Sequence, residues 1–210
     1  MDDIVTEVAR EKHGALVTVN ETERLRFNRE AWCERSVEVG EEIDLAELRK
    51  WLLPRQYPEA LNAAVRLLAV RSRSEAEICR ALRLRGYMDE TIDMVSYQLE
   101  RNELVNDEAF AREWAKARVH AGLGKNRILM ELRQKGVDSA ICESAVNELS
   151  EDERGESGKA LAAKLLKRYG GDDARDAIQK VMAGMSRRGY GYDEAKSAIE
   201  KALHDAETDA

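Results

Sequence analysis

Three segments of this chain share one pattern around a glycine, and these glycines recur about every 50 residues along the sequence. In each segment, apolar residues lie eight and four positions before the glycine, basic residues precede it, and one apolar residue follows it. A repeat of this length is typical of tandem helical modules that depend on their neighbours for stability. Such arrays bind other macromolecules more often than they catalyse reactions. The segments are Ile78–Tyr87, Ile128–Val137 and Val181–Tyr190.

The composition favours helices with solvated outer faces, because the chain has two prolines, 5% aromatic and 36% charged residues. We expect a mostly α fold with three tandem tri-helical repeats in an elongated array. A small N-terminal module with a β-hairpin and helices precedes them. The expected divisions are residues 1–58 for the N-terminal module, 59–105 and 106–150 for the first two repeats, and 151–210 for a hinge, the third repeat and a polar tail.

Turn signals place the N-terminal elements. Residues 15–19 and 24–27 read as two strands joined by a turn at residues 20–23. A later helix begins at Asp44, with Glu47 three residues on. Pro54 and Pro58 are expected to end that helix and to separate the N-terminal module from the first repeat.

Local signals also mark the ends of helices inside the repeats. Ser74 and Glu77 have the spacing of a capping box, in which each side chain satisfies a free backbone N–H. Gly86 is expected to close that helix in the left-handed conformation. The charged, glycine-containing segment 150–158 is predicted to be a hinge, and residues 205–210 a disordered tail.

The net charge of −7 conceals an alternation. Residues 60–85 carry six Arg and two Glu, whereas residues 86–105 carry one Arg and five acidic residues. Residues 112–135 and 159–189 each have a net charge of +5, and the segments that follow them, 136–149 and 190–210, have net charges of −3 and −4. The first two helices of each repeat are therefore basic and the third is acidic.

Two explanations of this alternation stay open. Solvated helices need charges of both signs, and acidic first turns with basic last turns complement the helix dipole. Alternatively, the basic groups form a stripe that follows phosphates or an acidic protein groove. On the second interpretation, the partner-binding residues are Arg80, Arg83, Arg85, Arg118, Lys125, Arg127, Arg133, Lys135, Arg187 and Arg188.

Residues for catalysis or metal binding are not found at a meaningful spacing. No Ser/His/Asp set or Cys/His pair is present, and the three cysteines lie far apart without a C-x-x-C motif. We therefore expect no enzyme activity, no metal and no cofactor. No apolar run reaches the roughly 20 residues of a membrane helix, and the acidic N-terminus lacks a signal-peptide pattern. These features favour a cytoplasmic protein without membrane contact.

The order of these motifs resembles the RecX family, the regulators of the RecA recombinase. The first repeat has the family's Ser74, Glu77 and an Arg-rich stretch before Gly86-Tyr87. The second is the most diagnostic, with Asp107-Glu108-Ala109-Phe110-Ala111 and Arg133-Gln134-Lys135-Gly136-Val137. The third matches through Lys167-Arg168-Tyr169-Gly170 and Arg187-Arg188-Gly189-Tyr190. Lys125 is a departure, because many members carry Pro there.

The resemblance covers about residues 60–204 and implies a partner. Proteins of this family bind the RecA filament on DNA, lie in its helical groove, and hinder its ATPase, strand-exchange and co-protease activities. The resemblance therefore implies a non-enzymatic regulator of the SOS response and homologous recombination. We expect a monomer with secondary contact to DNA phosphates.

Two other interpretations remain. The tri-helical modules resemble helix-turn-helix units, so the chain could bind DNA directly through the second helix of a repeat. Charge cannot separate this hypothesis from filament binding, although the overall acidity disfavours free DNA as the main partner. A third hypothesis is a helical adaptor for another protein.

Overall fold

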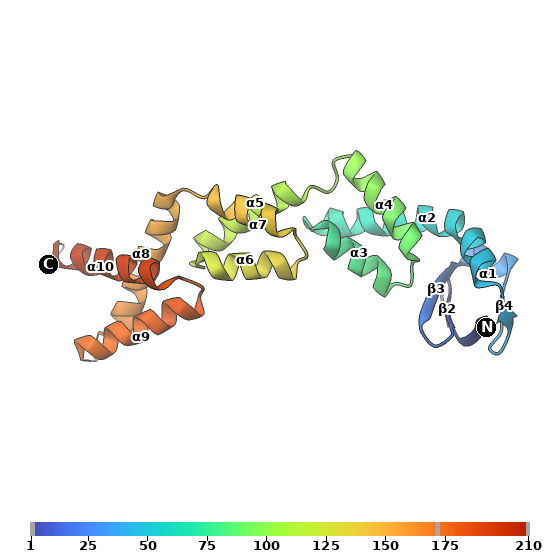
Figure 1. Ribbon diagram of the computed structural model, residues 1–210, viewed down its shortest axis with the longest axis horizontal. Coiled ribbons are helices and arrows are strands. Elements are labelled where there is room, and N and C mark those ends of the chain that lie inside the picture. Colours follow the sequence, from blue (N-terminus) through green and yellow to red (C-terminus); the bar gives the residue numbers. More distant parts are fainter. Residues whose placement is uncertain (1–2, 171–172, 209–210) are drawn as a thin grey trace. The chain divides into compact units, whose positions relative to one another are not determined.

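A computed structural model of the chain describes residues 3–170 and 173–208. Within these residues the protein is mostly helical, with ten helices and four strands. They form two compact units, Met1–Asn106 and Asp107–Ala210. The first unit holds the N-terminal module and the first tri-helical repeat, and the second holds the other two repeats (Figure 1).

The N-terminal module is built on a small antiparallel sheet of strand order β3-β2-β1-β4. The predicted hairpin is confirmed: β2 pairs with β3, and Asn20 and Glu21 turn the chain with φ of 50° and 62°. The two other strands were not predicted, because β1 buries only Val5 and β4 is two residues long. The strands are β1 (Asp3–Glu11), β2 (Gly14–Val19), β3 (Glu23–Asn28) and β4 (Glu42–Ile43).

A short helix, α1 (Arg29–Glu34), follows the hairpin, and the long helix α2 (Leu45–Val70) then begins at Asp44 as predicted. The predicted break at Pro54 and Pro58 is wrong, because α2 continues through both prolines. The expected boundary between residues 58 and 59 therefore lies inside a helix.

The reason is the position of the prolines on α2. Both rings are exposed, so the missing N–H groups lie away from the core. On the opposite face a buried residue recurs every fourth position without interruption. This stripe packs first on the sheet and then on the helices of the first repeat, so α2 is supported on both sides of the prolines. Its members are Leu48, Leu52, Gln56, Ala60 and Ala64.

The first repeat combines the second half of α2 with α3 (Glu75–Leu84) and α4 (Asp89–Arg101). The capping box of Ser74 and Glu77 is present, and Gly86 ends α3 with φ of +81°. Apolar residues at positions 78, 82, 92, 95 and 99 meet α2 in one core. The predicted helix signals are thus confirmed for this repeat.

The second unit contains two further tri-helical repeats, each with its own apolar core. In the second repeat, Gly136 ends the middle helix with φ of +83°, and in the third repeat Gly189 does so with φ of +89°. The helices are α5 (Asp107–His120), α6 (Lys125–Gln134), α7 (Ser139–Asn147), α8 (Glu151–Arg168), α9 (Ala174–Arg187) and α10 (Tyr192–Thr208).

The predicted hinge at residues 150–158 is wrong, because this segment forms the first turns of α8. Ser150 and Glu153 make a capping box that starts the helix. Gly158 is buried against Tyr190 and α10, because an added Cβ would lie 3.2 Å from Tyr190 Cε1 and 3.4 Å from Ala198 Cβ. Its small size therefore serves close helix packing.

The predicted disordered tail is also corrected, because α10 continues to Thr208. The last two residues of that tail, 209–210, lie outside the described residues.

Candidate partner-binding surface

In the first repeat, the three predicted basic residues are exposed on α3 and at its end. Arg83 forms an ion pair with Asp89, in which its Nε and Nη2 donate hydrogen bonds to Asp89 Oδ1 at 3.0 and 2.8 Å. Arg80 Nε donates to the carbonyl oxygen of Ala76 at 3.1 Å. The carbonyl oxygen of Arg85 accepts a hydrogen bond from Arg26 of the N-terminal module. This group is therefore partly engaged within its own unit.

The second repeat gathers cations around an aromatic ring. Trp114 stacks on Phe110, with ring centroids 5.9 Å apart. Arg118 Cζ and Lys135 Nζ each lie 4.0 Å from the centroid of Trp114. Cations at this distance are attracted to the electron-rich face of the indole. Trp114 is only partly buried, so it contributes both to the core and to the surface.

Glu131 joins α5 to α6 beneath these cations. Its Oε2 lies 2.8 Å from Arg118 Nε and accepts a hydrogen bond from Trp114 Nε1 at 3.3 Å. Its Oε1 accepts a hydrogen bond from Arg127 Nε at 3.4 Å. The Arg118 Nε–H is not aligned for a hydrogen bond, so that contact is an ion pair. We call Trp114, Arg118, Arg127, Glu131 and Lys135 the tryptophan cluster.

Arg118, Arg127 and Lys135 are among the partner-binding residues predicted from sequence, whereas Glu131 is not. A signal was available in the spacing: Arg127, Glu131 and Lys135 follow one another at intervals of four on one face of α6. That spacing predicts that the residues lie side by side. It could not reveal that α5 turns Trp114 toward the same face.

Arg133 and Lys125 do not join this cluster. Arg133 Nη2 lies 3.5 Å from Glu143 Oε1 on α7. Lys125 Nζ donates to Asn147 Oδ1, also on α7, at 3.1 Å. The group of Arg127, Arg133 and Lys135 expected from sequence is therefore split between two faces of the repeat.

The second and third repeats meet through backbone hydrogen bonds. The N–H of Gly124 donates to the carbonyl oxygen of Arg188 at 2.9 Å, and the N–H of Asn126 donates to that of Gly189 at 3.1 Å. The guanidinium of Arg188 lies beside Gly122. The structure thus brings Arg188 next to the start of α6, whereas the guanidinium of Arg187 lies near Gly184 of its own helix.

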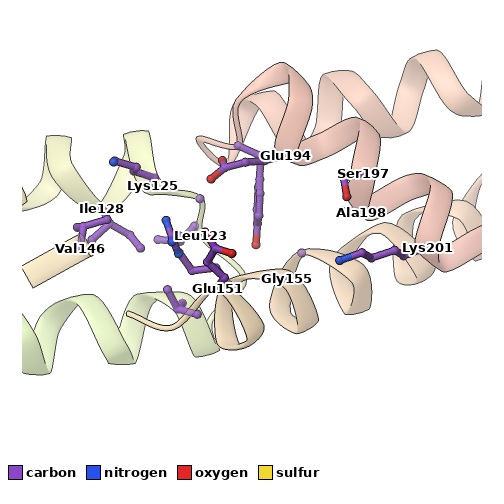
Figure 2. Close-up of a pocket in the computed structure, with 15 residues that line it drawn as sticks. Leu123, Lys125, Ile128, Val146, Glu151, Gly155, Glu194, Ser197, Ala198 and Lys201 are labelled. Carbon is purple, nitrogen blue, oxygen red and sulfur yellow. The ribbon is translucent and has the colours of Figure 1, made fainter. Parts of the chain in front are cut away.

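A cavity of about 360 Å³ lies at this joint, between the start of α6 and the helices α8 and α10 (Figure 2). Leu123 and Ile128 come from the second repeat, and Glu194, Ala198 and Lys201 come from α10 (Figure 2). Of the predicted residues, only Lys125 lines it. The cavity carries charges of both signs, because Glu151 and Arg154 also line it.

Two of the three cysteines are withdrawn from the surface, whereas Cys33 is exposed. Cys142 is buried and Cys79 is partly buried, and burial raises the pKa of both thiols. Across residues 3–170 and 173–208, no three His, Cys, Asp or Glu side chains are grouped so that they could hold a metal ion. In the same part of the chain, no helix is both long and apolar enough to cross a bilayer.

The fold and this surface define a tandem tri-helical repeat protein preceded by a small sheet module. Three family models match the chain: the first three-helix domain of RecX at residues 60–95, the second at 106–146 and the third at 151–199. The chain belongs to the RecX family.

Named relatives agree with this assignment. The chain is 34% identical to the regulatory protein RecX of Amycolatopsis mediterranei over 125 residues, which cover 59% of this chain and 71% of the relative. It is 33% identical to that of Streptomyces coelicolor over 142 residues, 67% of this chain and 76% of the relative. The family is one of regulatory proteins and is not a known enzyme family.

Solved structures show the same fold. A crystal structure of a regulatory protein RecX matches with a TM-score of 0.65 at 20% identity, and covers 95% of this chain and 99% of its own. The crystal structure of RecX from Lactobacillus salivarius matches with a TM-score of 0.67 at 26% identity, over 71% of this chain and 98% of its own.

Proposed function

We propose that this protein binds the filament that RecA forms on DNA and inhibits its recombinase, ATPase and co-protease activities. Membership of a family of regulatory proteins supports a regulatory role. The observation that carries the proposal is the tryptophan cluster, in which Arg118 and Lys135 lie against one partly exposed aromatic ring and Glu131 joins Arg127 to them. Tryptophan and arginine are the residues most enriched at the energetic centres of protein interfaces.

In this proposal the second repeat makes the main contacts. Trp114 supplies a rigid apolar surface, and Arg118, Arg127 and Lys135 supply positive charge around it. Arg80, Arg83, Arg85, Lys125, Arg133, Arg187 and Arg188 contribute secondary contacts to the filament or to DNA phosphates. A chain seated across more than one RecA subunit would restrain the subunit movements that accompany ATP hydrolysis. We further infer a cytoplasmic monomer that acts without a cofactor.

The DNA-dependent ATPase of RecA tests this function. The wild-type chain should inhibit it when added in excess over filament sites. The double variant Arg127→Ala/Lys135→Ala should require roughly 10-fold more protein for half inhibition, since two contacts of the cluster are lost. The control Arg112→Ala/Lys116→Ala removes two exposed cations of α5 that lie outside the cluster, and it should inhibit as the wild type does.

Absence of inhibition by the wild-type chain would exclude this function. The alternative, a DNA-binding protein built from helix-turn-helix-like modules, predicts a different result. It requires tight binding to DNA without RecA and a steep loss of affinity as the salt concentration rises. A fluorescence anisotropy titration of a labelled oligonucleotide over a series of salt concentrations separates the two.

A further inference from the structure

The two arginines that contact Glu131 are held through the same atom. Arg118 and Arg127 each approach the carboxylate with Nε, at 2.8 and 3.4 Å. An arginine held in this way keeps its two terminal Nη groups available for another acceptor. Among the described residues, none accepts a hydrogen bond from the Nη atoms of Arg118 or Arg127.

The three side chains differ in how far they are exposed to solvent. The side chain of Glu131 is 17% exposed, whereas those of Arg118 and Arg127 are 35% and 46% exposed. The carboxylate therefore lies beneath the guanidinium groups, and these are more accessible to solvent. Its negative charge also allows two positive groups from different helices to lie close together.

Trp114 restricts the arrangement further. Its indole Nε1 donates to the same oxygen of Glu131 that faces Arg118, and its ring lies 4.0 Å from the Arg118 Cζ. A guanidinium that contacts a ring and is held at Nε has few orientations left. Less conformational freedom is then lost when it binds a partner.

We propose that Arg118 and Arg127 form a two-arginine fork that is positioned by Glu131. This fork binds carboxylate groups of the partner protein, an inference that rests on the proposed function. Planar guanidinium groups match carboxylates through paired N–H···O bonds. Nucleic-acid phosphates fit the site less well, because the chain has a net charge of −7 and the carboxylate of Glu131 lies beside the fork. Binding of acidic side chains on a protein surface does not require a strongly positive electrostatic field, because the fork recognises them by short-range hydrogen-bond geometry.

The test separates geometry from charge. Arg118→Lys and Arg127→Lys keep the charge but lose the fork, so each should raise the half-inhibitory concentration on the RecA ATPase roughly 10-fold. Glu131→Gln keeps the shape of the side chain but loses the ion pairs, and it should weaken inhibition to a similar degree. The matched controls Arg112→Lys and Glu148→Gln alter exposed charged residues of the same repeat that lie outside the cluster and outside the predicted partner-binding residues. They should stay within about 2-fold of the wild type.

A positioning role for Glu131 predicts one further result. In an Arg118→Lys/Arg127→Lys background, Glu131→Gln should have little additional effect, because it acts through the arginines. If Glu131→Gln weakens inhibition as strongly in that background as in the wild type, Glu131 does not position the fork. Thermal unfolding of each variant shows whether a loss of inhibition merely follows a loss of folded protein.

Binding to a naked single-stranded oligonucleotide, without RecA, decides the class of ligand. The fork variants should bind it as the wild type does, whereas an equal loss of affinity for naked DNA would overturn the carboxylate assignment. Wild-type inhibition combined with unchanged Arg118→Lys and Arg127→Lys variants would overturn this inference alone. A wild-type chain that does not inhibit would overturn the proposed function and this inference with it.

Discussion

The backbone N–H of Asn126, in the first turn of α6, donates a hydrogen bond to the carbonyl oxygen of Gly189 at 3.1 Å. The first unit contains the same relationship, since the N–H of Arg26 donates to the carbonyl oxygen of Gly86 at 2.8 Å. In both cases the glycine ends the middle helix of a repeat, and the donor belongs to the preceding module. The glycine thus ends its own helix, and its carbonyl oxygen also accepts a backbone hydrogen bond from the neighbouring module.

Replacing Gly189 with Ala should destabilise the second unit. The residue has φ of +89°, and its new Cβ would collide with the backbone and Cβ of Arg127. Left-handed strain and the collision together should cost about 3 kcal/mol of unfolding free energy. Urea denaturation measures the loss, and hydrogen exchange should localise it to α6 and α9.

Gly155→Ala is the control for this change. Gly155 lies inside α8, where an added Cβ would meet only Lys201 Nζ, at 3.9 Å. Alanine is the better helix former, so this variant should be more stable by about 0.5–1 kcal/mol. Equal effects of the two substitutions would contradict the role assigned to Gly189.

Replacing Gln56 with Met should destabilise the first unit strongly. Gln56 is buried in α2, and its Nε2 donates to the carbonyl oxygen of Arg26 at 2.8 Å. Its Oε1 accepts hydrogen bonds from Met88 N and Thr91 Oγ1 at 3.1 and 3.0 Å. Met fills a similar volume but leaves these groups unpaired, at a cost of about 3–5 kcal/mol. Thermal denaturation followed by circular dichroism measures the effect.

The same change at Gln98 provides the comparison, because this side chain is only partly buried on α4. Gln98→Met should change the unfolding free energy by less than about 1 kcal/mol. If both variants lose stability equally, the hydrogen bonds of Gln56 are not responsible.

Tyr87 should make the first unit sensitive to alkaline pH. Burial, together with the nearby Glu59, raises its pKa from 10.0 to about 12. A group with a raised pKa in the folded state contributes stability that is complete below its unfolded pKa and is lost as the pH rises through its folded pKa. Unfolding free energy should therefore fall by about 2 kcal/mol between pH 10 and pH 12 because of this residue.

Tyr87→Phe removes this titration. Urea denaturation of the wild type and the variant at pH 9 to pH 12 measures the difference between their stabilities. That difference should shrink or reverse as the pH rises, because only the wild type must ionise a buried phenol. Two curves that stay parallel over this range would show that Tyr87 does not titrate as described.

Ser150→Ala should weaken the start of α8. The Ser150 Oγ accepts a hydrogen bond from the N–H of Glu153 at 3.0 Å, and Glu153 Oε2 accepts one from the N–H of Ser150 at 3.3 Å. Loss of the capping side chain should cost about 1 kcal/mol. Hydrogen exchange in the first turn of α8 should accelerate, whereas Ser197→Ala, exposed in the middle of α10, should leave it unchanged.

Local chemistry explains what could be predicted from sequence. The apolar spacing before Gly86 and the capping box of Ser74 and Glu77 depend only on neighbours within one helix, and both are present as expected. The same holds for the start of α2, which is expected at Asp44 and found there, because the Asp44 side chain accepts a hydrogen bond from the N–H of Glu47.

Non-local contacts explain what could not be predicted. Two prolines normally break a helix, but the buried stripe of α2 lies on the face opposite their rings. Likewise, Glu131 reads from sequence as one of many solvated acids. Its importance depends on Trp114 and Arg118 reaching it from another helix. Three cations of the tryptophan cluster are among the candidates predicted from sequence, whereas the carboxylate that joins two of them is not.

The continuity of α2 limits how such a protein can vary over evolution. A gene fusion or deletion that joins a foreign domain at residue 58 would cut the helix between Gln56 and Ala60, leaving half of the stripe with each product. The cut would also separate Met88 from the core of the sheet module, and Gln56 from its hydrogen-bond partners Met88 and Thr91. The N-terminal sheet and the first repeat should therefore be gained, lost and exchanged together, because α2 belongs to both.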